Sequence, residues 1–445
     1  MCSNSKSTQA APELRQWDST HLWHAFTQMQ EYEPLIFESA DGIWLTDVDG
    51  KRYLDGVSSL WCNVHGHRHP KLDAAIRDQL DRVAHVTLLG SSCDTSVRLA
   101  RKLAQITPAG LEHVFFSSDG ASAVEAALKM AFQYWMQKSE PEKRSRFMAL
   151  GSAYHGDTIG SVSLGGVEKF HALFHPLLFD TIRLPCPDYS AVADEMNESD
   201  AAKHYAQLMR KIFEEHHSDT AAVIVEPLMQ GAAGMIRHPQ GMLRAIRELC
   251  DEFNVLMIAD EVAVGFGRTG KLFACEHESV APDILCLGKG LTGGYLPLSA
   301  TVANTRVWDA FLGKADENKT LYHGHTFGGN PLACAVALAS IELFDSDEVL
   351  ENMKPSAARM TERLRRLLDH PKVKECRNIG LMAGIELHPA QNHSGASVCM
   401  RAREKNVLLR PLGDVVVVMP PLIAKPDEVD LIFDAVEHGL STDTI

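Results

Sequence analysis

Through the middle of the chain, short apolar runs alternate with helical patterns, and this alternation restricts the fold more than any other feature. The helical patterns include residues 121–137 and 242–253, where apolar side chains recur at helical spacing. Strands separated by helices form a largely parallel sheet with both faces covered. We therefore predict an α/β fold with a mostly parallel, doubly wound sheet. The expected strands are 113–118, 147–150, 221–228, 255–262, 283–287 and 298–303.

The two ends of the chain differ from this middle part. Residues 43–57 alternate in polarity between turn signals, which predicts short antiparallel strands on a smaller subdomain. After about residue 340 the pattern changes to charged helices with a few strands, including 384–387 and 415–418. We predict a disordered start (1–18), an N-terminal segment that joins the small domain (19–75), a large domain (76–340) and a C-terminal small domain (341–445).

Composition argues against several classes of function. The formal net charge of −15 and the pI near 5.8 leave no basic surface for nucleic acid or an anionic membrane. Ten cysteines without a C-x-x-C pair imply neither a disulfide framework nor a zinc site, and the HGHRH stretch (65–69) has no spacing typical of metal ligands. No apolar signal segment or membrane-spanning stretch is visible. We expect a cytoplasmic protein without a bound metal.

Lys289 lies in the stretch DILCLGKGLTGG (283–294), between an apolar run and a glycine-rich turn. At the end of a buried strand its amine can lose hydration, which lowers its pKa and makes it nucleophilic enough to form an imine. Taken alone, the pattern is also typical of a lysine that marks a strand end and points to water. A chemical role therefore depends on the rest of the chain.

A second candidate feature follows residues 113–118, where Asp119-Gly120 leads into a helix predicted to start near Ala121. A strand, a turn of small residues and a helix N-terminus together form an anion site, because free backbone N–H groups and the positive end of the helix dipole point to one place. Many α/β units carry such a turn without a ligand, so the motif alone is weak. It predicts a site for a phosphate group.

Two carboxylates, Asp260 and Glu261, follow an apolar strand within the stretch VLMIADEVAVGFGRTG (255–270). Burial of a carboxylate is costly unless a cation or a strong donor meets it, so a positive group must lie nearby. One alternative is a structural ion pair, for which Arg268 is the candidate. The other is a functional acid, because Asp260, Glu226 and Lys289 all fall at strand ends of one predicted sheet.

Asp260, Lys289 and the turn at Gly120 together meet the three demands of pyridoxal phosphate. A buried acid holds the ring nitrogen protonated, a lysine forms the imine, and a helix N-terminus holds the phosphate. Once displaced by an amino substrate, Lys289 becomes the general base that moves a proton between the substrate Cα and C4′ of the cofactor. We therefore predict pyridoxal 5′-phosphate as the cofactor, with Lys289 and Asp260 as catalytic residues.

Five motifs occur in an order and spacing that are specific. They are YHGD (154–157), VEP (225–227), ADEVAVGFGRTG (259–270), LGKGLTGG (287–294) and HGHTFGGNPLA (323–333). In this order they resemble the class III pyridoxal-phosphate aminotransferases of fold type I, over nearly the whole chain. The resemblance implies a smaller α+β domain built from both chain ends, and a homodimer whose active sites lie at the subunit boundary.

The resemblance also implies roles for further residues. Tyr154 packs at the cofactor ring, Val262 lies against its other face, and Glu226 supports Asp260. Ala121 stands where many relatives have serine, so one phosphate hydrogen bond must come from elsewhere, with Ser122 as the candidate. The implied cofactor-binding set is Gly120, Ala121, Tyr154, Glu226, Asp260, Val262, Lys289, His325 and, from the partner subunit, Thr326.

Further segments narrow the resemblance: HLWHAFTQM (21–29), GVSSLWCNVHGHRHP (56–70), KMAFQYW (129–135), AYHGDTIG (153–160), FACEH (273–277) and RPLGDVVVVMPPL (410–422). They resemble the biotin-synthesis branch of the family, which converts 8-amino-7-oxononanoate to 7,8-diaminononanoate. Arg410 then takes a substrate carboxylate, which its planar fork suits, although a surface arginine before a proline is the alternative. The implied substrate-binding set is Phe26, Leu60, Trp61, Tyr154, Lys289, Gly324 and Arg410.

Four positions depart from the branch that uses S-adenosyl-L-methionine as amino donor. That branch has a Trp-Trp pair, an N-terminal Tyr, a Gly-Pro-Thr loop and a Tyr in the last strand. Fewer aromatic and phenol groups weaken the case for binding a sulfonium and resemble the branch that uses L-lysine. The donor stays open between S-adenosyl-L-methionine, the family default, and L-lysine, which the chemistry favours. The residues at these positions are Leu60-Trp61, Phe26, Gly324-His325-Thr326 and Val417.

Two other functions share parts of this pattern. A broad omega-aminotransferase that uses pyruvate has the same core residues but would not need the segments WHAFTQM (23–29) and SSLWCNVHGH (58–67). A catalytically silent binding protein on the same fold predicts the loss of Lys289 or Asp260, and both are present.

Overall fold

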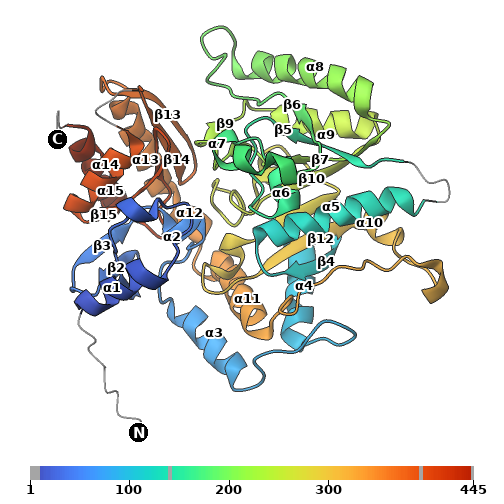
Figure 1. Cartoon of the computed structure of the whole chain (residues 1–445), viewed down its shortest axis with the longest axis horizontal. Helices are drawn as coiled ribbons and strands as arrows, with labels where there is room; N and C mark the ends of the chain where they lie inside the picture. Colours follow the sequence, from blue (N-terminus) through green and yellow to red (C-terminus); the bar gives the residue numbers. More distant parts are fainter. Residues whose placement is uncertain (1–10, 139–142, 390–393, 442–445) are drawn as a thin grey trace.

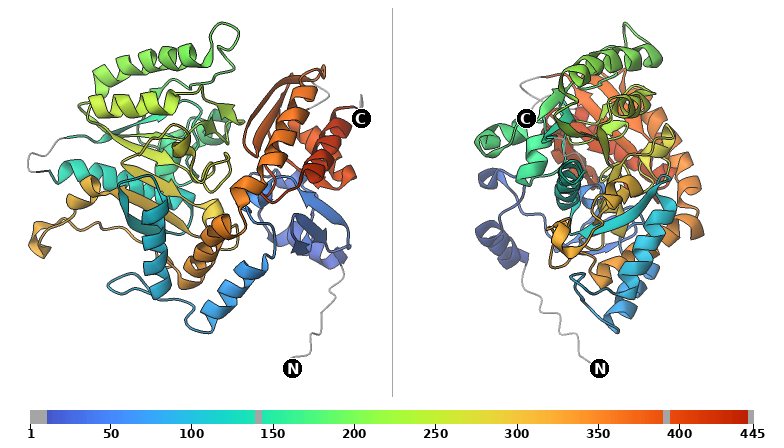
Figure 2. Two further views of the ribbon diagram at one scale, coloured as in Figure 1. Left: turned by 180° about the vertical axis from the view of Figure 1, so that it is seen from behind. Right: turned by 90° about the vertical axis from the view of Figure 1, so that its right-hand side faces the viewer.

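The computed structural model describes residues 11–138, 143–389 and 394–441. Figures 1 and 2 show a larger body around a central sheet and a smaller body that contains the first and last described elements of the chain. The blue N-terminal strands and the red C-terminal helices lie side by side in the smaller body (Figure 1). The predicted division into a central large part and a small part formed by the two ends is therefore visible in the arrangement of the elements, while the boundaries at residues 75 and 340 remain predictions.

The larger body contains a seven-stranded sheet in the order β4-β12-β11-β10-β7-β5-β6. The strands from β11 to β6 are mutually parallel, whereas β12 runs antiparallel to both β11 and β4. All six predicted runs are strands of this sheet, and β6 is a further short strand. The bounds are β4 (Leu111–Ser117), β5 (Arg146–Leu150), β6 (Ile182–Leu184), β7 (Thr220–Val225), β10 (Leu256–Asp260), β11 (Ile284–Leu287) and β12 (Ser299–Asn304).

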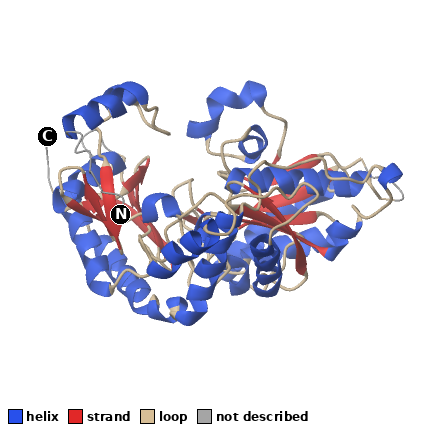
Figure 3. Ribbon diagram, turned by 90° about the horizontal axis from the view of Figure 1, so that it is seen from below, coloured by secondary structure: helices blue, strands red, loops and turns tan. Residues whose placement is uncertain are grey.

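Helices cover both faces of this sheet (Figure 3), which explains why its strands are apolar throughout. In β7, Val223 and Val225 belong to the core that includes α8 and α9, while Ala222 and Ile224 belong to the core on the side of α5. Successive side chains of a strand point to opposite faces, so both sets must be apolar. The helices are α5 (Gly120–Met136), α8 (Glu198–His216) and α9 (Met242–Glu252).

The smaller body contains two four-stranded sheets, β1-β2-β3-β15 and β13-β14-β17-β16. The parallel pairing of β15 with β3 joins the C-terminal part of the chain to its N-terminal part. β2 and β3 pair antiparallel, as the turn signals predict. The bounds are β1 (Phe37–Asp41), β2 (Trp44–Asp47), β3 (Arg52–Asp55), β13 (Val373–Ile379), β14 (Met382–Leu387), β15 (Val407–Leu408), β16 (Arg410–Leu412) and β17 (Val415–Val418).

The start of the chain differs from the prediction of disorder over residues 1–18. Residues 1–10 lie outside the described residues, but Ala11–His21 forms the helix α1. Arg15 of this helix pairs with Asp49, in the turn between β2 and β3. A contact with a folded turn orders a polar segment whose own composition suggests disorder.

The other described elements complete the two bodies. None of the described helices is long and apolar enough to cross a membrane. The remaining bounds are α2 (Ser58–Trp61), α3 (Pro70–Leu80), α4 (Asp94–Ile106), α6 (Ile159–Leu164), α7 (Glu168–His171), β8 (Met229–Gln230), β9 (Ile236–Arg237), α10 (Thr305–Asp309), α11 (Pro331–Ser346), α12 (Val349–Asn352), α13 (Lys354–Leu367), α14 (Gly395–Ala402) and α15 (Pro426–Leu440).

Candidate active site

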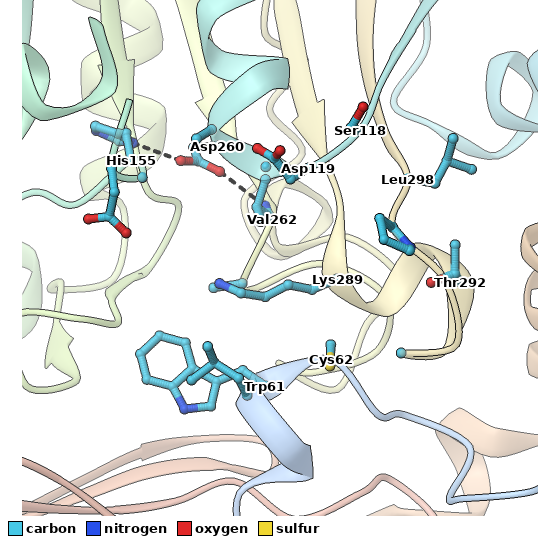
Figure 4. Close-up of a pocket in the computed structure, with 18 of the residues that line it drawn as sticks. Trp61, Cys62, Ser118, Asp119, His155, Asp260, Val262, Lys289, Thr292 and Leu298 are labelled. Carbon is cyan, nitrogen blue, oxygen red and sulfur yellow. Dashed lines mark hydrogen bonds and ion pairs between the residues drawn. The ribbon is translucent and has the colours of Figure 1, made fainter. Parts of the chain in front are cut away.

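A cavity of about 690 Å³ opens at the carboxyl ends of β7, β10 and β11, next to the N-terminus of α5. Ligands of open α/β sheets bind at this edge. Asp260 is the last residue of β10, Glu226 follows β7 directly, and Lys289 comes shortly after β11. Figure 4 shows Lys289 between Asp260 on one side and Trp61 on the other. The structure therefore brings together the three predicted strand-end residues.

Lys289 holds its amine inside this cavity. Its backbone has a φ of 42°, a strained value for a non-glycine residue of the kind that clusters at active sites. Its Nζ lies 5.0 Å from the centre of the Trp61 ring. Burial lowers the pKa of the Lys289 amine below its ordinary value, and the carboxylates of Asp260 and Glu226 oppose that shift. A less protonated amine is a better nucleophile and base, so the geometry favours a chemical role over a lysine that points to water.

Asp260 is held by two partners that fix the direction of its carboxylate. Its Oδ2 lies 2.7 Å from Nδ1 of His155, and its Oδ1 accepts a hydrogen bond from the backbone N–H of Val262 at 3.1 Å. Asp260 and His155 are both buried. His155 is therefore the hydrogen-bond donor that the buried acid requires. Sequence reasoning missed this role, although the residue lies inside the YHGD motif and a search for a donor to Asp260 could have found it.

Backbone donors hold the carboxylate of Glu226. Its carboxylate accepts hydrogen bonds from the backbone N–H groups of Tyr154 at 3.0 Å and Gly231 at 2.9 Å. Burial raises the pKa of Glu226 to about 7, and the nearby charge of Asp260 acts in the same direction. The described hydrogen bonds of Glu226 go to backbone donors and not to Asp260, and its predicted support of Asp260 stays a prediction.

Tyr154 lines the cavity, and its hydroxyl is engaged. The hydroxyl donates a hydrogen bond to Oδ2 of Asp157 at 2.7 Å. Burial, followed by the hydrogen bond and the charge of Asp157, raises the pKa of the Tyr154 hydroxyl well above its ordinary value. This pair holds the ring in a fixed orientation at the cavity wall, and Asp157 is a second member of the YHGD motif whose role sequence reasoning missed.

Glu261, the neighbour of Asp260, does not line the cavity. Its carboxylate accepts hydrogen bonds from the backbone N–H groups of Ala274 at 2.6 Å and Cys275 at 2.8 Å, and burial raises its pKa to about 7. The alternative of a structural ion pair with Arg268 is wrong. Backbone donors satisfy the carboxylate, and the guanidinium donates to other groups, the carbonyl oxygens of Leu381 and Pro420 and Oγ of Ser58.

The predicted anion site falls at the N-terminus of α5, which begins at Gly120. Asp119 caps the helix by accepting a hydrogen bond from the backbone N–H of Ser122 at 2.9 Å. The backbone N–H groups of Gly120 and Ala121 have no acceptor in the described part of the chain. A Cβ at residue 120 would lie 2.6 Å from Cγ1 of Val262, so this position requires glycine. Two free N–H groups at a helix N-terminus suit a phosphate.

The hydroxyl of Ser122, the sequence-based candidate for the additional phosphate hydrogen bond, is engaged by the helix cap. Its hydroxyl donates to Oδ1 of Asp119 at 3.1 Å, and the side chain is buried. Ser118 lines the cavity next to Asp119 and is the better-placed hydroxyl. The capping interaction that engages Ser122 depends on where α5 begins, which sequence patterns place only to within a few residues.

Several predicted residues lie outside the cavity of this chain. Phe26 is 63% exposed and packs edge-on against Phe170, which packs edge-on against Tyr154. Nδ1 of His325 lies 3.5 Å from Oγ of Ser118, at the margin of the anion site. Their binding roles stay predictions. The predicted residues that do not line the cavity are Phe26, Gly324, His325, Thr326 and Arg410.

Arg410 and Val417 lie opposite each other on β16 and β17. Arg410 is exposed, whereas Val417 is fully buried in the core of the smaller body. Val417 therefore does not line the cavity. The predicted role of Arg410 as a carboxylate ligand depends on an approach from outside the cavity of this chain.

The histidines of the HGHRH stretch separate into different environments. Nε2 of His65 lies 2.9 Å from the carbonyl oxygen of Ser340, and Nε2 of His67 lies 2.9 Å from Oδ2 of Asp55. His69 lies near Asp347, at 3.6 Å. Among the described residues, no group of three or more His, Cys, Asp or Glu side chains is placed to hold a metal ion.

Comparisons with known proteins agree with this geometry. The family model described as aminotransferase class-III matches residues 27–440. The chain is 50% identical over 441 residues to the adenosylmethionine-8-amino-7-oxononanoate aminotransferase of Nitratidesulfovibrio vulgaris, which covers 96% of this chain and 81% of that protein. The crystal structure of the enzyme so named from Methanocaldococcus jannaschii has a TM-score of 0.90 at 40% identity, with 96% and 99% of the two chains covered.

A PLP-bound amine transaminase from an uncultivated Pseudomonas species has a TM-score of 0.87 at 36% identity, with 95% and 98% of the chains covered. The protein therefore belongs to the class III aminotransferases. It has the fold type I architecture of pyridoxal-phosphate-dependent transferases, and its cofactor is pyridoxal 5′-phosphate. The site fits that group, because a buried carboxylate, a partly desolvated lysine amine and free N–H groups at a helix N-terminus border one cavity.

Proposed function

We propose that this enzyme transfers an amino group to 8-amino-7-oxononanoate and so forms 7,8-diaminononanoate for biotin synthesis. The observation that carries this proposal is the similarity, over 96% of the chain, to relatives named for that acceptor. The cavity supports it, because aliphatic and aromatic side chains suit a long aliphatic substrate. Those side chains are Leu60, Trp61, Ala232, Leu296 and Leu298.

In this proposal, Lys289 and Asp260 carry the chemistry. Bound pyridoxal phosphate supplies an electron sink for the charge that develops at the reacting carbon of the substrate. Asp260, held by its two hydrogen-bond partners, keeps a proton on the ring nitrogen. The amine of Lys289 moves a proton at the carbon that bears the transferred amino group, for which a lowered pKa suits it. The backbone N–H groups of Gly120 and Ala121 bind the phosphate.

Product formation tests the acceptor. The purified enzyme, loaded with pyridoxal phosphate, is incubated with 8-amino-7-oxononanoate and an amino donor, and 7,8-diaminononanoate is measured by mass spectrometry. We expect the diamine to form. A robust reaction with pyruvate and a simple amine, without turnover of 8-amino-7-oxononanoate, would instead establish a broad omega-aminotransferase. The similarity to the solved amine transaminase makes that function the main alternative.

For the donor, we propose L-lysine ahead of S-adenosyl-L-methionine. Leu60 lines the cavity and is 46% exposed, so an aliphatic side chain stands where a second tryptophan would strengthen cation binding. The relatives named for adenosylmethionine support the other donor. A single-turnover experiment separates the two, because each amino acid alone converts the pyridoxal form to the pyridoxamine form only if it is a donor. No spectral change with lysine would contradict this part of the proposal.

Arg410 is proposed to bind the acceptor carboxylate, because its guanidinium forms bidentate hydrogen bonds that an ammonium group cannot reproduce. No carboxylate of the described residues pairs with its side chain, and the charge that acts on it most comes from Arg403. We expect Arg410→Lys to raise the KM for 8-amino-7-oxononanoate by about 10- to 100-fold with a small change in kcat. Steady-state kinetics with both donors measure this, with Arg401→Lys on α14 as control. An unchanged KM for the acceptor contradicts the assignment.

We further propose a homodimer with shared active sites, in which Thr326 of the partner subunit reaches the phosphate. Large exposed apolar side chains near this segment support an interface, since Tyr322 is 79% and Phe327 61% exposed. Light scattering measures the mass in solution. Mixing Lys289→Ala and Thr326→Ala chains tests the sharing: hybrid dimers regain activity only if the two residues serve one site from different subunits. A monomer, or no regain, contradicts the proposal.

The proposal includes a cytoplasmic location. The acidic composition and the free thiols of the nine described cysteines support it. Fractionation of cells that express the full chain measures the location, and recovery outside the cytoplasmic fraction would contradict it.

A further inference from the structure

The turn Ser58–Trp61 forms part of the cavity wall in a strained backbone conformation. Ser58, Ser59 and Trp61 have φ values of 52°, 59° and 63°, in the left-handed region that residues with side chains rarely adopt. Such strain persists only where the surrounding structure holds it. The contacts of this turn therefore determine where the Trp61 ring stands relative to Lys289.

A buried carboxylate holds the start of the turn. Asp55 is 1% exposed and accepts hydrogen bonds from the backbone N–H groups of Val57 at 3.2 Å and Ser59 at 2.8 Å. Nε2 of His67 lies 2.9 Å from Oδ2 of Asp55, and Nδ2 of Asn63 lies 3.0 Å from Nδ1 of His67. One imidazole ring thus bridges the carboxylate that precedes the turn and an amide that follows it.

The directions of these hydrogen bonds follow from the donors available. Nδ2 of Asn63 donates to Nδ1 of His67, so His67 carries its proton on Nε2 and donates it to Asp55. Oδ2 of Asp55, which accepts from His67, also accepts from the backbone N–H of Ser59. His67 therefore holds in place Oδ2 of Asp55, and this oxygen in turn binds the backbone of the strained turn at Ser59.

The ring of Trp61 is buried and closely packed. Trp61 is 7% exposed, and its ring centre lies 5.0 Å from Nζ of Lys289. A Cβ at Gly231 would lie 3.3 Å from Cζ3 of Trp61, so the ring also packs near the backbone of Gly231. At its start the turn is also tied to the smaller body, where Oγ of Ser58 donates to the carbonyl oxygen of Met419 at 2.7 Å. A change at the Asp55 end therefore moves Leu60 and Trp61 together.

We propose that His67, acting through Asp55, is a positioning residue that sets the substrate-facing surface formed by Leu60 and Trp61. His67 does not line the cavity, so it acts on substrates only through the turn. Loss of the bridge lets the turn relax and weakens the binding of the amino substrates, while Asp260 keeps its partners His155 and Val262. The proposal rests on the proposed function for the identity of those substrates, but not for the position of the turn.

Three variants of the holoenzyme test the bridge. His67→Phe removes both hydrogen bonds at a similar ring size, whereas His67→Gln retains an N–H donor for Asp55. His438→Phe is the matched control. His438 lies on α15, its Nε2 is 2.8 Å from a carboxylate oxygen of Glu404, and it does not line the cavity. We expect the KM for 8-amino-7-oxononanoate to rise about tenfold in His67→Phe with kcat changed less than about threefold. His67→Gln recovers most of the affinity, and His438→Phe changes neither constant.

A second readout does not depend on catalysis. Cys62 follows Trp61, is partly buried and lines the cavity, while Cys186 and Cys376 are partly buried thiols elsewhere. Alkylation by iodoacetamide is followed by mass spectrometry of the peptides. We expect Cys62 to react severalfold faster in His67→Phe than in the unmodified enzyme, with Cys186 and Cys376 unchanged as internal references.

Three outcomes overturn the positioning role. They are unchanged KM and Cys62 reactivity in His67→Phe, a fall in kcat as large as the rise in KM, and faster alkylation of all three cysteines, which marks general loosening. Failure of the proposed function can be distinguished from failure of the positioning role. If the unmodified enzyme does not turn over 8-amino-7-oxononanoate, the alkylation rate of Cys62 still measures the position of the turn.

Discussion

The two sides of the cavity are built by different means. The strand-end side (Glu226, Asp260 and Lys289) stands on parallel strands whose residues are buried throughout, and its carboxylates are met by hydrogen bonds. The loop side (Leu60 and Trp61) stands on a strained turn held from outside the cavity. Reacting groups require a fixed geometry, which strand ends supply, whereas substrate choice changes more readily on turns and loops. We therefore expect the strand-end side to govern kcat and the loop side to govern KM.

The largest expected effect is on the strand-end side. Lys289→Ala should reduce kcat by more than about 10⁴-fold, because it removes both the covalent attachment of the cofactor and the general base. Reduction with borohydride should attach the cofactor to the unmodified protein and to the control Lys271→Ala, whose lysine donates to the carbonyl oxygen of Glu276 at the surface. Attachment that persists in Lys289→Ala would remove this residue from the mechanism.

Asp260→Asn should reduce kcat by about 10²- to 10³-fold with a small change in KM, because an amide cannot hold the proton on the ring nitrogen. His155→Phe should follow with about a 10- to 100-fold loss, since it removes only the partner that orients Asp260. Steady-state kinetics together with the absorbance of the bound cofactor measure both. If either variant raised KM and left kcat unchanged, the division between the two sides would not hold.

The buried glutamates make stability depend on pH. The pKa values of Glu226 and Glu261 are raised to about 7, so both are protonated in the folded state where the unfolded chain is already ionised. Their stabilising contribution is complete below the unfolded pKa of about 4.5 and is lost as pH rises through about 7. We expect the free energy of unfolding to fall by about 1–3 kcal/mol per glutamate between about pH 5 and pH 8.

Urea unfolding at several pH values measures this fall. Glu261→Gln should reduce it, because glutamine carries no charge to bury, whereas Glu214→Gln on the exposed surface of α8 should not. A fall of the same size in both variants would show that Glu261 stays ionised in the folded protein and would assign the effect to other groups.

The smallest effect is expected on the loop side. Leu60→Trp places a second aromatic ring beside Trp61 at a position that is 46% exposed, and a cation near an aromatic face gains about 0.5–2 kcal/mol. The ratio of kcat/KM for S-adenosyl-L-methionine to that for L-lysine should rise about 2- to 30-fold. Half-reaction kinetics with each donor measure the ratio. An equal change for both donors would show that residue 60 does not select between them.

The sequence alone determined the strand-end side. Apolar runs and helical periods are local patterns, and they placed all six predicted strands. Because side chains at the carboxyl ends of parallel strands meet at one edge, the positions of Asp260, Glu226 and Lys289 in the sequence were enough to predict that they share a cavity. Gly120 similarly predicted an anion site from the sequence. The structure adds that a Cβ at this residue would clash with Val262.

Only the tertiary structure decided the partners of these groups. His155 meets Asp260 across 105 residues, and His67 meets Asp55 from the opposite side of a turn whose strain no local pattern shows. Arg268 donates to carbonyl oxygens instead of a carboxylate, and backbone N–H groups satisfy Glu261. Hydrogen-bond partners depend on which segments the fold brings within about 3 Å of each other. Tertiary packing determines this proximity, and the local periodicity of apolar residues does not reveal it.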